Sequence, residues 1–235
     1  NMSNNFEFEF EDYDPLEAKP ITKKSMVIFF VIDTSESMKG KKIDDLNRVM
    51  REIIPQLAGV GGCNTELKYA VLSFSSGCKW ITSEPMIVED NNSWKDLSAN
   101  GITDLGMAFE ELTSMLSRKK FLKSPSLSYA PVIFLMTDGY PTDNYKKGLE
   151  KLKNNNWYKY GMKIALGIGD YFDEATIMST FRYSYTYASS MLFSDAEKLS
   201  IGSLTNINGL SDIFSMQSVK KDFGYKFINK NNIFI

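Results

Sequence analysis

The sequence predicts an α/β fold in which a doubly wound, mainly parallel central sheet is flanked by helices. Apolar runs rich in β-branched and aromatic residues alternate with segments whose apolar residues recur at helical spacing. Runs that are apolar throughout are typical of strands buried on both faces, as in parallel sheets. The chain has 235 residues, 43% of them hydrophobic, which is enough for one domain with a sizeable core.

The first half of the chain begins the alternation of strands and helices. A strand is expected at 25–33 ("SMVIFFVID"), followed by a helix over 41–59 in which Pro55 tightens or ends the last turn. A second strand is expected at 65–76 ("TELKYAVLSFSS"). The segment 78–89 ("CKWITSEPMIVE") predicts one or two further strands at an edge of the sheet.

The second half continues the same pattern. A helix is predicted over 103–122, opened by Thr103 or Asp104 as its N-cap, with Met107, Phe109 and Leu112 facing the core. The remaining expected elements are a strand at 130–139, a helix at 143–160, a strand at 161–170, a short helix at 173–182, a strand at 186–195 and a helix at 210–221. The predicted organisation is an acidic arm or edge strand over 1–22, one domain over 23–220, and a tail over 221–235.

Composition excludes several classes of function. The formal net charge is −2 and the pI is about 5.4, so no basic surface for nucleic acid is expected. No apolar run approaches the ~18 residues of a membrane span, and the first residues lack the pattern of a signal peptide. The two cysteines do not form a CxxC pair. A cytoplasmic location is therefore expected.

The absence of histidine constrains the chemistry further. The chain contains no histidine at all, which removes catalysis by Ser-His-Asp or Cys-His groups and zinc sites that need imidazole. Any bound metal must then be held by oxygen ligands, which favours hard cations.

Small oxygen-bearing side chains follow the predicted central strands. Asp33, Ser35 and Ser37 alternate where the first strand ends, Asp138 ends the strand at 130–139, and Thr103 starts a helix between them. In an open parallel sheet the carboxyl ends of the strands form the ligand site. Two carboxylates and three hydroxyls suit a Mg²⁺ ion that keeps some water. Each group also has a simpler reading, as a helix cap or as turn chemistry. For Asp104 we favour a helix-start carboxylate over a contact with the metal.

Three motifs in order resemble the von Willebrand factor type A (VWA) family: "DTSES" at 33–37, "GITDLG" at 101–106 and "LMTDG" at 135–139. The resemblance implies a Rossmann-like fold and a metal-ion-dependent adhesion site (MIDAS). It implies Mg²⁺ as the metal, with Mn²⁺ or Ca²⁺ as alternatives, and a protein partner that completes the coordination with an Asp or Glu carboxylate. The implied metal ligands are Asp33, Ser35, Ser37, Thr103 and Asp138, and no residue is implied to be catalytic.

Further segments resemble stand-alone bacterial VWA proteins of the TerY-like, tellurium-resistance type, among them "VLSFSS" and "KIALGIG". That resemblance implies an intracellular stress-response or phospho-signalling system, with a kinase and phosphatase pair as candidate partners. One residue departs from the family pattern: Ile102 stands where a glycine or another small residue commonly precedes the threonine.

Two other functions stay open at this stage. The chain could be a metal-bearing scaffold subunit of an ATPase-linked, chelatase-like complex. A Mg²⁺-dependent phosphohydrolase is the third possibility, but that chemistry needs a second carboxylate as general acid where this chain has Ser35. The sequence therefore favours a non-enzymatic interaction module.

Overall fold

The structure is a computed structural model that describes residues 23–59, 65–89, 93–124, 128–138, 140–168, 183–187 and 227–229. Its strands are β1 (Lys24–Asp33), β2 (Thr65–Ser75), β3 (Gly77–Trp80), β4 (Met86–Ile87), β5 (Val132–Thr137), β6 (Met162–Ile168), β7 (Tyr183–Tyr187) and β8 (Phe227–Asn229). Its helices are α1 (Lys41–Gln56), α2 (Leu105–Met115), α3 (Tyr145–Asn154) and α4 (Asn156–Tyr160), with short 3₁₀ turns at Glu36–Met38 and Leu57–Gly59.

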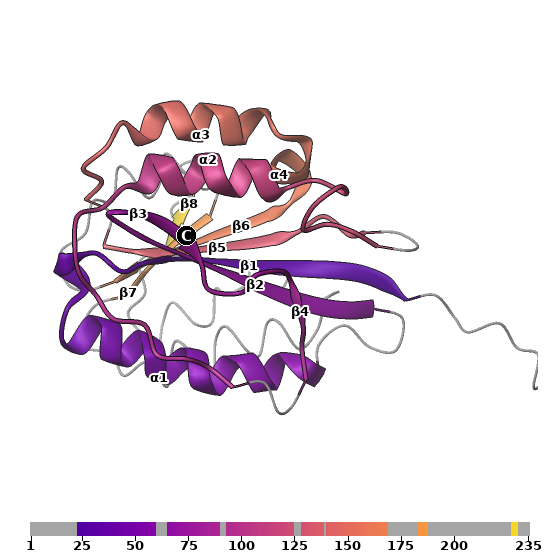
Figure 1. The fold of residues 1–235 in the computed structure, drawn as a ribbon, viewed down its shortest axis with the longest axis horizontal. Coiled ribbons are helices and arrows are strands. Elements are labelled where there is room, and N and C mark those ends of the chain that lie inside the picture. Colours follow the sequence, from indigo (N-terminus) through magenta and orange to yellow (C-terminus); the bar gives the residue numbers. More distant parts are fainter. Residues whose placement is uncertain are drawn as a thin grey trace, which may run out of the picture.

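The strands form one mixed sheet in the order β3-β2-β1-β5-β6-β7-β8, with β4 also paired to β2 (Figure 1). The central pairs β2–β1, β1–β5, β5–β6 and β6–β7 are parallel. The pairs β2–β3, β2–β4 and β7–β8 at the two edges are antiparallel. The predicted mainly parallel α/β sheet is therefore confirmed, as is the placement of 78–89 at an edge.

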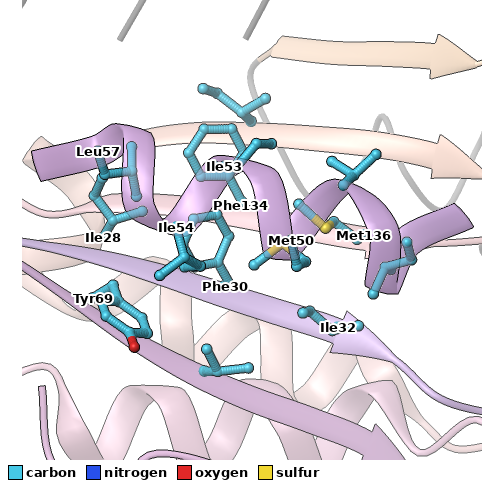
Figure 2. Packing of buried hydrophobic residues seen from close by; sticks show 14 of the residues in the cluster. Ile28, Phe30, Ile32, Met50, Ile53, Ile54, Leu57, Tyr69, Phe134 and Met136 are labelled. Carbon is cyan, nitrogen blue, oxygen red and sulfur yellow. The ribbon is translucent and has the colours of Figure 1, made fainter. Parts of the chain in front are cut away.

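Helices cover both faces of the sheet, with α1 on one side and α2, α3 and α4 on the other (Figure 1). Strand β1 is buried on both faces, because its side chains alternate between two apolar clusters. On the α1 side, Phe30 stacks on Phe134 with ring centroids 5.4 Å apart, beneath Met50 and Ile54 of the helix (Figure 2). On the other side, Phe29 packs into the cluster built with α2 and α3.

Helix α2 is shorter than predicted. It ends at Met115 instead of continuing to residue 122, and the chain folds back so that the Phe121 amide donates to the Met115 carbonyl. This turn places Phe121 against Trp80, with ring centroids 4.6 Å apart. The gain from burying two aromatic rings outweighs the helical propensity of the segment. The prediction that Met107 faces the core is wrong, since it is 51% exposed, whereas Phe109 and Leu112 are buried.

The predicted helix at 143–160 is two helices, divided at Asn155. The Asn155 side chain accepts hydrogen bonds from the amides of Trp157 and Tyr158 and so caps the start of α4. Strand β7 begins at Tyr183, three residues before the predicted strand at 186–195, most of which lies outside the described residues. The predicted arm over 1–22 and the helices at 173–182 and 210–221 also lie outside them. The sequence did not predict β8, which falls within the segment assigned as a tail.

Helices α2 and α3 approach each other closely at two glycines. A Cβ atom at Gly148 would lie 2.3 Å from the backbone oxygen of Gly106. Such a contact cannot be relieved by moving a flexible side chain, because the neighbouring atom belongs to the backbone. The packing of α3 on α2 therefore requires glycine at position 148.

Among the described residues, no helix is both long enough and apolar enough to span a membrane.

Replacement of Gly148 by alanine tests this packing. Alanine favours a helix over glycine, yet we expect Gly148→Ala to lower the free energy of unfolding by about 1–3 kcal/mol, since the two helices must separate. Glu150→Ala, at an exposed position of the same helix, should change it by no more than about 0.5 kcal/mol. Urea denaturation followed by circular dichroism measures both. Equal or greater stability of Gly148→Ala would contradict the close approach.

Candidate metal centre

Two of the five predicted site residues, Asp33 and Asp138, lie where the direction of strand order reverses. From β1 the chain passes through α1 to β2 on one side, and later through α2 to β5 on the other side. Asp33 is the last residue of β1 and Asp138 directly follows β5, and these two strands are parallel neighbours in register at Ile32 and Met136. The carboxyl ends of strands at such a switch point are the usual ligand site of an open α/β sheet.

The Asp33 carboxylate is fully buried. Its Oδ1 accepts a hydrogen bond of 2.8 Å from the Ser35 amide, and its Oδ2 accepts one of 2.6 Å from the Thr137 hydroxyl. Burial raises the pKa of Asp33 because it disfavours the charged form, and these hydrogen bonds offset only part of that effect. The nearby charge of Asp138 raises the pKa of Asp33 further.

The Asp138 carboxylate is 1% exposed and only half satisfied. Its Oδ2 accepts a hydrogen bond of 3.1 Å from the Lys42 ammonium group. Its Oδ1 is buried and has no hydrogen-bond partner among the residues that the structure describes. An orphaned buried carboxylate oxygen is costly, so this atom indicates a missing cationic or donor ligand.

The two serines of the first motif lie next to each other. The backbone of Ser35 is extended, and a 3₁₀ turn over Glu36–Met38 follows it. The hydroxyl oxygens of Ser35 and Ser37 are 3.0 Å apart, with Ser35 buried and Ser37 exposed. The alternation read from the sequence therefore does bring these two side chains together, although the extended backbone continues only to Ser35.

Hydrogen bonds join the loop of Thr103 to the first motif and to the loop that follows the third motif. The Thr103 amide donates to the Thr142 hydroxyl and the Thr142 amide donates to the Thr103 carbonyl, at 3.0 and 2.9 Å. On the other side, the Glu36 amide donates to the Gly101 carbonyl at 2.9 Å. Gly101 has φ of +85°, and a Cβ there would lie 2.5 Å from the Ser76 hydroxyl, so glycine is required. The bulk of Ile102 extends into solvent, where it is 52% exposed.

Asp104 stands at the start of α2, as expected, and its side chain also bonds another loop. It occupies the N-cap position of α2, but its Oδ2 accepts from the Gly77 amide at 2.7 Å and so closes the turn between β2 and β3. The first amides of α2 are capped instead by Asp143, whose carboxylate accepts from Gly106 and Met107 at 3.0 and 3.1 Å. The prediction that Asp104 stands at the start of this helix is therefore confirmed, but its side chain does not cap the helix amides, because a carboxylate from another loop takes that place.

Several positioning residues were missed by the sequence reasoning. Asn47 of α1 holds the loop that leads to Thr103, since its side chain donates to the Leu97 carbonyl and accepts from the Leu97 amide, each at 2.8 Å. Thr137 orients Asp33, and Thr142 fixes the Thr103 backbone. Thr137 carried a signal, since it stands beside Asp138 in the "MTDG" motif. The other two bond to residues 39 and 50 positions away, which no local pattern reveals.

The donor set fits a hard divalent cation. It offers two buried carboxylates, hydroxyl groups on connected loops, and one carboxylate oxygen without a partner. Within the described ranges, no three acidic, cysteine or histidine side chains gather as a metal site would require if it used those types alone. A site here would therefore rely on hydroxyl oxygens as well. The assignment of the five residues as metal ligands stays a prediction.

The fold, together with the polar side chains at the carboxyl ends of β1 and β5, defines a doubly wound α/β domain with a candidate ligand site at its switch point. Residues 28–141 match the model of the von Willebrand factor type A domain family. This part of the chain is therefore similar to VWA domains, a class that generally serves in metal-dependent protein interaction.

Solved structures share the fold. The ArnB paralog VWA2 from Sulfolobus acidocaldarius aligns with a TM-score of 0.54 and 17% identity over 78% of this chain and 45% of that chain. The PilB minor pilin from Streptococcus sanguinis aligns with a TM-score of 0.55 and 15% identity, over 81% of this chain and 64% of that chain. A von Willebrand factor type A protein from Catenulispora acidiphila aligns with a TM-score of 0.52 and 16% identity, over 77% of this chain and 42% of that chain. The chain thus spans less than two thirds of each of these relatives. No curated protein matches its sequence.

The raised pKa of Asp33 predicts how the metal-free protein responds to pH. The folded state holds the Asp33 proton more tightly than the unfolded state, whose pKa is near 3.8. Stability is therefore lost as pH rises from that value through the raised pKa. We expect Asp33→Asn to remove this loss, so that in chelator its unfolding temperature at pH 7 equals or exceeds that of the unmodified protein.

Thermal unfolding between pH 4 and 8 in the presence of EDTA measures the difference between the two proteins. The comparison isolates Asp33, since all other titrating residues are shared. If Asp33→Asn were less stable at pH 7 and kept the same pH profile, the burial cost assigned to this carboxylate would be wrong.

Proposed function

We propose that this domain is a metal-dependent protein-interaction module without catalytic activity. In this proposal Asp33, Ser35, Ser37, Thr103 and Asp138 hold a divalent cation, and a carboxylate from a protein partner completes its coordination. The observation that carries the proposal is the buried Asp138 Oδ1, which lacks a partner beside a second buried carboxylate. A cation would relieve both the unpaired oxygen and the repulsion between Asp33 and Asp138.

The ligand chemistry favours Mg²⁺, with Mn²⁺ and Ca²⁺ as alternatives. All candidate donors are oxygens, and the set contains only two charged groups, so a bound ion would keep water or accept an external carboxylate. When bound, the ion supplies the positive charge that attracts such a carboxylate. The residues of this chain provide the fixed oxygen positions, because the loops that carry them are tied to each other by backbone hydrogen bonds.

The surroundings of the site favour contact with a protein. Three large apolar side chains are about half exposed on the loops that carry Thr103 and Asp138 or on the helix turn that follows: Ile102 at 52%, Met107 at 51% and Tyr140 at 53%. Exposed apolar residues gathered near a polar site are typical of interaction surfaces. We call these three residues the apolar rim.

The same geometry argues against hydrolysis of phosphate esters. Ser35 is buried next to the Ser37 hydroxyl, at the position where a phosphohydrolase needs a second carboxylate. A serine hydroxyl is too weak an acid to donate its proton at neutral pH, so it cannot serve as the general acid. A bound cation would therefore act here as a binding group.

The biological setting we propose follows from the resemblance of the sequence to TerY-like proteins. It is an intracellular, cytoplasmic stress-response or phospho-signalling system, with a kinase and phosphatase pair as candidate partners. Recovery of a large ATPase as the stable partner would instead favour a scaffold role.

Metal binding is the first test of the proposal. We expect the unmodified protein to bind Mg²⁺ and Mn²⁺ in titration calorimetry and to unfold at a higher temperature when either is present. Asp33→Ala should weaken binding at least about tenfold, because it removes one of only two charged ligands. Asp96→Ala is the matched control, since Asp96 is a surface residue paired with Arg51 and should leave binding unchanged. Absence of metal binding by the unmodified protein would overturn the proposal.

Partner capture is the second test. We expect proteins retained from a native cell extract in Mg²⁺ to be released by EDTA and to be absent with Asp33→Ala, as read by mass spectrometry. Ile102→Ser should lower the retained amount by about fivefold or more, since burial of a large apolar side chain contributes ~1.5–3 kcal/mol. Ile87→Ser is the control, because Ile87 is 47% exposed on the edge strand β4. Capture that is indifferent to both EDTA and Asp33→Ala would contradict a metal-mediated contact.

A further inference from the structure

A lysine from α1 contacts the candidate metal centre. Lys42, the second residue of that helix, places its Nζ 3.1 Å from Oδ2 of Asp138, and its side chain is 30% exposed. The two neighbouring lysines differ from it. Lys39 pairs with Glu36 and Lys41 pairs with Asp45, and their side chains are 54% and 74% exposed. Of these three, Lys42 alone is directed at the site.

The contact changes the charge of the site. The carboxylates of Asp33 and Asp138 contribute −2, and the ammonium group of Lys42 contributes +1. The serine and threonine hydroxyls are neutral. Among the described residues of the adjoining loops, the other acidic side chains have their own partners: Glu36 bonds Lys39, Asp104 bonds an amide, and Asp143 caps α2. The contacting groups therefore total −1 without a metal, and a divalent cation would bring them to +1.

We infer that Lys42 sets the anion preference of this site, an inference that rests on the proposed metal-binding function. In the metal-free protein its ammonium group neutralises Asp138. With a divalent cation present it leaves the centre with one positive charge, which a single carboxylate neutralises. Lys42 thereby weakens the hold on the metal through like-charge repulsion and strengthens the hold on a monoanionic carboxylate.

Two opposite changes follow from removing this charge. Lys42→Gln keeps an N–H donor on a side chain that is one atom shorter, but carries no charge. We expect it to bind Mn²⁺ more tightly, by about fivefold, because the repulsion between two cations in a largely buried site is lost. We expect its Mn²⁺-loaded form to bind acetate more weakly, by about fivefold, because the centre becomes neutral.

The experiment uses the full chain and two probes. Titration calorimetry measures Mn²⁺ affinity, and the relaxation rate of water protons on Mn²⁺ measures how much acetate is needed to displace bound water. Lys41→Gln, which removes the same charge from an exposed position, should stay within about twofold of the unmodified protein in both assays. Lys42→Arg, which keeps the charge, should behave as the unmodified protein does. Thermal unfolding in EDTA verifies that each variant is folded.

The outcomes separate the two proposals. Tighter Mn²⁺ binding together with weaker acetate binding in Lys42→Gln alone supports the inference. If Mn²⁺ binds the unmodified protein, but Lys42→Gln binds Mn²⁺ equally or less tightly, or matches Lys41→Gln, the role of Lys42 is overturned while the metal site stands. If the unmodified protein does not bind Mn²⁺, the proposed function fails, and the inference fails with it.

Discussion

Two carboxylates, Asp33 and Asp138, are buried at the ends of adjacent central strands, and this juxtaposition of like charges constrains the rest of the site. Burial raises the pKa of Asp33, and the charge of Asp138 raises it further. A chain selected only for stability would not place unmatched charges here, since an apolar pair would pack at lower cost. Hydrogen bonds from the Ser35 amide, the Thr137 hydroxyl and Lys42 offset part of the cost of burying the two carboxylates. One oxygen of Asp138 still has no partner among the described residues.

The fold makes this arrangement rigid. Strand β1 is buried on both faces, so the position of Asp33 is fixed by the packing of the residues that precede it. The loop of Thr103 is held at three points, by Glu36 from the first motif, by Thr142 from the loop after the third, and by Asn47 of α1 through Leu97. A displacement of any one loop is therefore opposed by the other two, which keeps the candidate ligands at fixed separations before a cation arrives.

Much of this architecture follows from patterns that the sequence displays locally. Continuous apolar runs predicted the central strands, and the residues that end them predicted Asp33 and Asp138 at one edge. Other features depend on contacts between distant residues. Helix α2 ends early because Phe121 packs against the ring of Trp80. The first amides of α2 bond the Asp143 side chain and not that of Asp104, because the loop after β5 lies against the start of α2. Met107 is apolar, yet it is exposed because helical spacing places it on the face of α2 opposite the buried Phe109 and Leu112.

The electrostatics and the hydroxyl groups support the same proposed function. A centre that must stabilise a reacting phosphate needs a proton donor and a high density of positive charge, whereas the described residues of this one offer Ser35 and a single lysine. An ion held by two carboxylates and neutral hydroxyls keeps much of its attraction for a further anion. The apolar rim then favours a carboxylate presented on a protein surface over a free, hydrated anion, because burial of side chains around it adds affinity that a small ion cannot obtain.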